Sequence, residues 1–131
     1  MGKTILVVDD NKAIAEIIER RLTIAGYTVL TAGDGKQALV TVAARRPDCV
    51  LLDIMMPDMS GLEILRQLKS DPTTAAIPII LVTAKGEDTD IEQGYREGAA
   101  AYLTKPFSAA QIVDAVRKIL RAAADPAPSA C

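Results

Sequence analysis

The stretch Leu-Leu-Asp-Ile-Met-Met-Pro-Asp-Met-Ser-Gly, residues 51–61, decides the fold. It continues an apolar run that begins at Cys49, reaches Asp53 and then turns polar and irregular. A near-continuous apolar run of this length is typical of a parallel strand that is covered on both faces. Asp53 therefore stands where a buried strand ends. Ser60 with Glu63 matches a capping box, which predicts a helix directly after it.

The same unit of strand and helix recurs along the chain. The runs that predict strands are Ile5–Val8, Tyr27–Thr31, Cys49–Leu52, Ile79–Val82 and Ala101–Leu103. Five such units indicate an α/β fold with a doubly wound parallel sheet, because each parallel crossover needs a covering helix. For a five-stranded sheet of this kind, the flavodoxin-like (β/α)5 order 2-1-3-4-5 is the natural choice.

Helical patterns separate the apolar runs. The predicted apolar faces are Ile14, Ile17, Ile18 and Leu22 in the first helix, and Ile112, Val113, Val116, Ile119 and Leu120 in the last. Further capping boxes are Asp34 with Gln37 and Ser108 with Gln111. Gly26 is placed to end the first helix. The fourth segment, residues 88–97, offers only Ile91 and Tyr95 at helical spacing, which predicts low local stability.

Length and composition are those of one soluble domain. The 131 residues are 50% hydrophobic and 24% charged, with a net charge of −2, which argues against a general nucleic-acid binder. No apolar stretch approaches the ~20 residues of a membrane span. We expect a domain over residues 1–122 and a disordered tail or linker start over 123–131. Cys49 is expected in the core of a reduced, cytoplasmic protein that contacts neither membrane nor DNA.

Histidine is absent from the sequence, and this excludes several kinds of chemistry. The chain has no His-ligated metal site and no nucleophile activated by a histidine. Any metal must be held by oxygen ligands, which favours Mg²⁺ or a similar hard cation.

Polar and charged side chains stand at the ends of the predicted strands. The first predicted strand ends at Asp9 and Asp10, and the third ends at Asp53. The fourth predicted strand ends at Thr83, and Lys105 follows the fifth. Carboxyl ends of parallel strands meet at one rim of the sheet. Three carboxylates there would repel one another unless a cation or a lysine lies among them. The pattern predicts a Mg²⁺ site in which an aspartate attacks a phosphorus centre and a lysine and a hydroxyl bind the phosphoryl oxygens.

Four stretches occur in order on these predicted elements. They are Ile-Leu-Val-Val-Asp-Asp (5–10), Leu-Leu-Asp-Ile-Met-Met-Pro-Asp-Met-Ser-Gly (51–61), Val-Thr-Ala (82–84) and Ala-Tyr-Leu-Thr-Lys-Pro-Phe (101–107). Together, over about residues 3–120, they resemble the receiver domain of bacterial two-component response regulators.

The resemblance implies a role for each matching residue. It implies that Asp53 is the phosphoacceptor and that Mg²⁺ is held by Asp9, Asp10, Asp53 and the backbone carbonyl of Met55. It also implies that Lys105 and Thr83 bind the phosphoryl group. Thr83 and Tyr102 would form a conformational switch, and Pro106 would be a cis proline. The physical reading of the switch is that Thr83 moves toward the phosphoryl oxygens and vacates space for the tyrosine ring.

The implied function is a signalling switch that catalyses only its own phosphorylation and dephosphorylation. Its expected donor is a sensor histidine kinase or a histidine phosphotransfer protein. Its expected target is a protein or an absent output domain that contacts the fourth helix, fifth strand and fifth helix; a phosphorylation-dependent homodimer is a further expectation. The alternative is a Mg²⁺-dependent phosphatase that forms an aspartyl phosphate on small substrates, which would need a lid that the short loops do not offer. A nucleotide-binding domain would need a Gly-rich loop after the first strand.

Overall fold

The computed structural model describes residues 3–56, 58–84 and 88–124. The elements in chain order are β1 (Thr4–Val8), α1 (Lys12–Ile24), β2 (Thr28–Ala32), α2 (Gly35–Arg45), β3 (Cys49–Asp53), α3 (Gly61–Ser70), β4 (Ile79–Ala84), α4 (Asp88–Arg96), β5 (Ala101–Lys105) and α5 (Ala109–Ala124). The α/β class and the five predicted strands are confirmed, with strand ends that differ by one or two residues.

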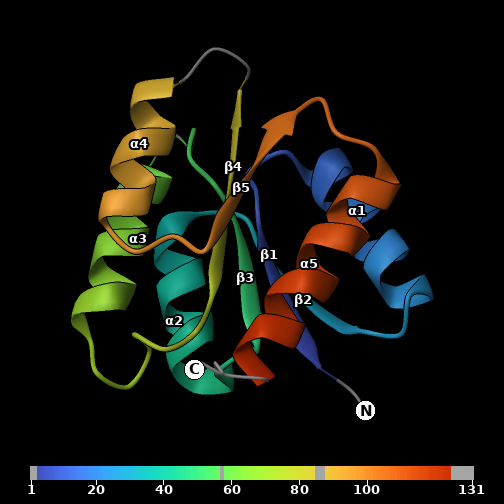
Figure 1. Cartoon of the computed structure of the whole chain (residues 1–131), viewed down its shortest axis with the longest axis horizontal. Coiled ribbons are helices and arrows are strands. Elements are labelled where there is room, and N and C mark those ends of the chain that lie inside the picture. The colour runs from blue at the N-terminus through green and yellow to red at the C-terminus, as the bar shows by residue number, and fades with distance from the viewer. Residues whose placement is uncertain (1–2, 57, 85–87, 125–131) are drawn as a thin grey trace, which may run out of the picture.

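The strands form one parallel sheet in the order β2-β1-β3-β4-β5, as predicted. The register aligns their carboxyl ends: Asp53 pairs with Val82, and Ala84 pairs with Lys105. In Figure 1 the arrowheads of β4 and β5 point to the same, upper end of the molecule. At this end of the sheet the chain continues from β1 to β2 and from β3 to β4, which lie on opposite sides of the central β1–β3 pair. Doubly wound folds place their sites at such a point.

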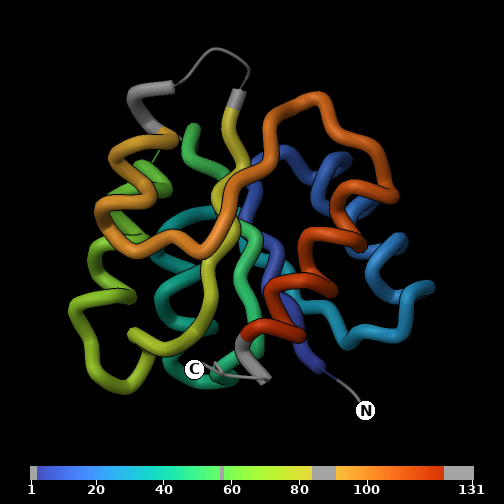
Figure 2. Tube along the Cα trace, viewed as in Figure 1, coloured from blue at the N-terminus to red at the C-terminus, as the bar shows by residue number. Residues whose placement is uncertain are grey.

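Helices cover both faces of the sheet. Figure 1 shows α1 and α5 on one side and α2, α3 and α4 on the other. Alternate residues of a strand therefore enter different cores: Leu51 belongs to the same buried core as Val116 of α5, and Leu52 belongs to the same buried core as Leu65 of α3. This double coverage is why the strands are continuously apolar in sequence. Figure 2 shows the start of β1 and the end of α5 at the end of the molecule opposite the rim.

All three predicted N-cap side chains cap their helices, but among the described hydrogen bonds only one of the three predicted boxes is reciprocal. Ser108 and Gln111 form a reciprocal box, in which each backbone amide donates to the other side chain at 2.8 and 3.1 Å. Asp34 accepts a hydrogen bond of 2.7 Å from the Gln37 amide at the start of α2. Ser60 accepts one of 3.1 Å from an amide in the first turn of α3.

One expectation about the helices needs correction. Ile17 does not belong to the buried stripe of α1, because its side chain is 60% exposed while Ile18 and Leu22 are buried. The helical period of 3.6 residues places position 17 beside the face that turns toward the sheet. The last helix, α5, ends at Ala124. Residues 125–131 lie outside the described structure.

Two sequence-level expectations concern burial and membranes. Cys49 is buried and free, and its burial raises the thiol pKa to about 12, so it is a core residue as predicted. Among the described helices, none has both the length and the apolar character that crossing a bilayer requires.

Candidate functional site

The structure brings three aspartates together at the carboxyl end of the sheet. Asp9 and Asp10 follow β1, and Asp53 is the last residue of β3, the strand beside it. One carboxylate oxygen from each lies within 4.8 Å of the others. Asp9 and Asp53 are buried, with 4% of each residue exposed, whereas Asp10 is exposed. Three oxygen donors this close, two of them out of bulk water, form a candidate metal centre.

Lys105 supplies the positive charge of the site. Its Nζ donates a hydrogen bond of 3.2 Å to Asp53 Oδ2 and lies 3.6 Å from Asp9 Oδ2. The lysine side chain is 29% exposed, and those of the two aspartates are 3 and 5% exposed. Because the carboxylates are nearly out of reach of water and salt, this attraction is screened less than a surface ion pair.

One lysine does not balance three carboxylates. Burial raises the pKa of Asp53 above its ordinary value, the charge of Lys105 opposes that rise, and the charge of Asp9 adds to it. Three carboxylates and one ammonium leave two negative charges, −3 + 1 = −2, which a single divalent cation neutralises. The oxygen-only donor set also suits a hard cation such as Mg²⁺.

Local backbone hydrogen bonds aim the two buried carboxylates. The amide of Asn11 donates to Asp9 Oδ1 at 2.8 Å, and the amide of Met55 donates to Asp53 Oδ1 at 3.1 Å. Each of these hydrogen bonds closes an Asx turn, in which an aspartate carboxylate accepts from the amide two residues later. In both residues Oδ1 is held by the backbone, and Oδ2 is the atom nearest to Lys105. The site is therefore preorganised by the strand ends themselves.

The loop after β3 is fixed at both of its ends. Gly61 lies so close to the Asp53 backbone that an added Cβ would collide with its carbonyl oxygen. The carboxylate of Asp58 accepts from the Gly35 amide at 3.1 Å to each oxygen, and from the Lys36 amide at 3.4 Å. The loop is thus tied to the start of α2. Sequence reasoning missed the role of Asp58, because its partners lie more than 20 positions away in the chain.

The predicted switch residues lie on β4 and β5. Thr83 is buried at 1% exposure, whereas Tyr102 is 41% exposed. Tyr102 is paired in register with Leu81, two residues before Thr83, so Thr83 and Tyr102 are diagonal neighbours on one face of the sheet. The Tyr102 ring contacts the ring of Tyr95 on α4, a contact that sequence reasoning missed. The Lys105–Pro106 peptide bond is cis, as the resemblance implies.

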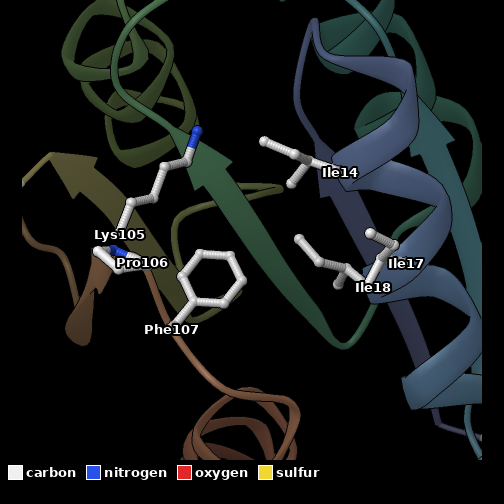
Figure 3. Close-up of a pocket in the computed structure, with 6 residues that line it drawn as sticks. All are labelled: Ile14, Ile17, Ile18, Lys105, Pro106 and Phe107. Atoms are coloured by element: carbon white, nitrogen blue, oxygen red, sulfur yellow. The ribbon is translucent and has the colours of Figure 1, made fainter.

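An apolar cavity of about 490 Å³ opens beside Lys105. It is lined by Ile14, Ile17, Ile18, Lys105, Pro106 and Phe107. Figure 3 shows Ile14 and Ile18 of α1 extending toward the Phe107 side of the cavity, with Ile17 beside Ile18 and the Lys105 side chain rising toward the end of β3. The exposed position of Ile17, which the stripe in the sequence did not predict, is explained by this cavity.

Comparisons with known proteins find similar sequences and folds. Residues 5–117 match the model of the response regulator receiver domain family. The chain is 47% identical over 121 residues to the phosphate regulon transcriptional regulatory protein PhoB of Pseudomonas aeruginosa, covering 92% of this chain and 53% of that protein. It is 45% identical over 121 residues to the response regulator PleD of Caulobacter vibrioides, covering 92% and 27%. The chain therefore spans about half or less of these curated relatives.

Solved structures show the same fold. A putative response regulator from Chloroflexus aurantiacus superposes with a TM-score of 0.88 at 34% identity, covering 92% of this chain and 99% of that one. A CheY-like receiver domain protein from Methanospirillum hungatei superposes with a TM-score of 0.91 at 26% identity, covering 97 and 100%.

Proposed function

Since the chain belongs to the response regulator receiver domain family, we propose that it is a phosphorylation-controlled switch whose phosphoacceptor is Asp53. The observation that carries the proposal is the position of Asp53. It is buried at the end of a central strand, accepts a hydrogen bond from Lys105 and lies beside two further carboxylates. The family is one of signalling switches rather than of turnover enzymes.

Mg²⁺ is the cofactor that this donor set fits. Asp9, Asp10 and Asp53, with the backbone carbonyl of Met55, would hold the ion. When bound, it supplies charge neutralisation for the phosphoryl oxygens. Those oxygens would otherwise approach a site that already has two uncompensated negative charges. Phosphorylation is therefore expected to require the metal.

The protein residues act on the nucleophile and on the transferred group. A carboxylate oxygen of Asp53 forms the bond to phosphorus while the bond from phosphorus to the donor breaks, and the donor atom leaves with the electron pair. An ionised carboxylate has no proton to lose, so no general base is needed. Lys105, which already bonds Asp53, binds a phosphoryl oxygen and neutralises its charge. Thr83, near the carboxyl end of the neighbouring strand β4, contributes a hydroxyl hydrogen bond.

The readout is a change at the outer edge of the sheet. Thr83 moves toward the phosphoryl group, and the Tyr102 ring turns from its exposed position into the space that Thr83 leaves. This changes the surface formed by α4, β5 and α5, through which we propose that a downstream protein, an output domain or a second copy of the chain is bound.

The donor is proposed to be a sensor histidine kinase or a histidine phosphotransfer protein of the cytoplasm. A protein donor must bring its phosphorylated atom to Asp53, so its surface must rest on the rim of the sheet. The apolar cavity between α1 and Phe107 borders that rim and offers contact area beside Lys105 (Figure 3). No DNA binding by this chain is proposed.

The test is phosphorylation of the chain by acetyl phosphate, followed by intact-mass measurement. Wild type should gain one phosphoryl group with Mg²⁺ and none with EDTA, and Asp53→Asn should gain none. Asp114→Asn, an exposed aspartate of α5, is the matched control and should behave as wild type. Continuous turnover of a simple phosphate ester would instead favour the phosphatase alternative. A phosphorylated Asp53→Asn variant would refute the proposal.

A further inference from the structure

We propose that Tyr95 is a positioning residue of the switch: its ring holds Tyr102 outward and so sets how readily the phosphorylated state is reached. This rests on the proposed function of Asp53 and on the switch at Tyr102. It adds a residue of α4 that neither the sequence motifs nor the site chemistry assigns to the switch.

The register of the sheet turns Tyr102 toward α4. Tyr102 is paired with Leu81, and Leu81 belongs to the core that lies under α2 and α3. Residues paired in a parallel register point to the same face, so the tyrosine ring emerges on the side that α4 covers (Figure 1). Thr83 follows Leu81 by two positions and lies on this face too.

A glycine allows α4 to approach the sheet closely. A Cβ added to Gly94 would collide with the end of the Leu81 side chain, so the helix backbone at Gly94 lies against this side chain of β4. Tyr95 is the next residue, and its ring meets that of Tyr102 edge to face, with centroids 5.8 Å apart and an interplanar angle of 82°. The close approach of the helix thus brings the two rings within contact distance.

The contact is local and belongs to the outward position. Tyr95 is 47% exposed and Tyr102 is 41% exposed, so each ring covers part of the other that water would otherwise reach. Burial raises the pKa of the Tyr95 hydroxyl, and the neighbouring Tyr102 adds to the rise. If Tyr102 turns inward, it leaves this edge contact. Tyr95 therefore stabilises one of the two states of the switch.

The strength of an edge-to-face pair gives the size of the effect. Loss of such a contact between partly exposed rings shifts the ratio of outward to inward Tyr102 by about two- to tenfold. By linkage, a ligand that favours the inward state then binds more tightly by the same factor, as long as the outward state predominates. Beryllofluoride with Mg²⁺, a mimic of the phosphoryl group, is a suitable ligand.

The experiment uses the full chain labelled with fluorotyrosine, whose three tyrosines give separate fluorine resonances. Tyr95→Leu should bind beryllofluoride about two- to tenfold more tightly than wild type. Its Tyr102 resonance should lie nearer the bound position before any ligand is added. Tyr95→Phe keeps the ring and should stay within about twofold of wild type. Tyr95→Met is a second variant without a ring and should repeat the leucine result.

The Tyr102→Leu background separates this contact from a general effect on α4. In that background Tyr95→Leu should leave beryllofluoride affinity unchanged, because the partner ring is gone. Unchanged affinity and an unchanged Tyr102 resonance in Tyr95→Leu and Tyr95→Met, with wild type responding normally, would overturn the role of Tyr95 alone. Failure of wild type to bind beryllofluoride, or to shift its Tyr102 resonance on binding, would overturn the proposed switch and this inference with it.

Discussion

Lys105 Nζ and Asp53 Oδ2 lie 3.2 Å apart across the ends of β5 and β3, although 52 positions separate the two residues in the chain. The same ammonium lies 3.6 Å from Asp9. One cation thus serves two buried carboxylates, and the pKa of Asp53 stays raised by burial even in its presence. The metal-free site has an excess of negative charge that binding of Mg²⁺ would relieve.

The raised pKa of Asp53 predicts a pH-dependent stability. The folded protein binds this proton more tightly than the unfolded chain, whose aspartates titrate near their ordinary value. Protonation of Asp53 therefore stabilises the folded protein. This stabilisation is complete at a pH below the aspartate pKa of the unfolded chain, and it is lost as the pH rises through the raised pKa of folded Asp53. In EDTA at pH 7, Asp53→Asn should be more stable than wild type, because the variant buries no charge at this position. The difference should narrow toward acid pH in urea unfolding series.

Addition of Mg²⁺ is the control for this charge effect. The ion should stabilise wild type more than Asp53→Asn, because the variant has lost one carboxylate ligand and the repulsion that the ion relieves. A variant that is less stable than wild type in EDTA at every pH would contradict the electrostatic account.

Gly61→Ala should damage the site through the backbone. The new methyl group would overlap the carbonyl oxygen of Asp53, so we expect a loss of about 3 kcal/mol in the free energy of unfolding, with weaker Mg²⁺ binding. Gly33→Ala is the matched control at the same rim, because its Cβ would meet only Gln37 Oε1, at 3.8 Å. It should change the stability by less than about 0.5 kcal/mol. Equal effects of the two substitutions in thermal unfolding would show that the close approach is not important.

Asp58→Ala should loosen the loop that follows Asp53. It removes the acceptor for the Gly35 and Lys36 amides, which should cost about 1–2 kcal/mol and weaken Mg²⁺ binding, measured by calorimetric titration. Asp114→Ala removes a carboxylate whose ion pair with Lys118 is exposed, and should cost no more than about 0.5 kcal/mol. Unchanged metal affinity in Asp58→Ala would mean that the tie does not position the loop.

Met55→Asn should shorten the life of the phosphorylated state. Met55 is 65% exposed, and its own amide donates a hydrogen bond to Asp53. Because the residue lies this close to Asp53, we expect its side chain to border the path of a water that attacks the acyl phosphate. An asparagine there would hydrogen-bond that water, and we expect dephosphorylation to become several-fold faster when phosphate release is followed after removal of the donor. Val40→Asn, an equally exposed site on α2, should leave the decay rate unchanged.

Sequence reasoning predicted the strands and their order because strands buried on both faces must be continuously apolar, as residues 49–52 are. It also predicted that Asp9, Asp53 and Lys105 would meet, because a parallel register aligns the strand ends. The individual roles of these residues remain predictions for the experiments above.

Contacts between side chains distant in sequence could not be predicted in this way. The position of Asp58 in the sequence does not indicate a contact with Gly35, because Asp58 lies in the loop after β3 and Gly35 begins α2. Tyr95 stands at helical spacing from Ile91, and this spacing does not reveal that its ring contacts Tyr102 on β5. Ile17 also fits the apolar pattern of its helix but borders a cavity instead. Periodicity identifies the apolar side of a helix, not the partner of each residue.

The most direct measurement of the central claim is to locate the phosphoryl group. The chain is incubated with Mg²⁺ and acetyl phosphate, the acyl phosphate is reduced with borohydride, and the peptides are sequenced by mass spectrometry. We predict that the aspartate at position 53, and no other, is converted to homoserine. Conversion at a different aspartate, or an unmodified Asp53 in a chain that has gained a phosphoryl group, would contradict it.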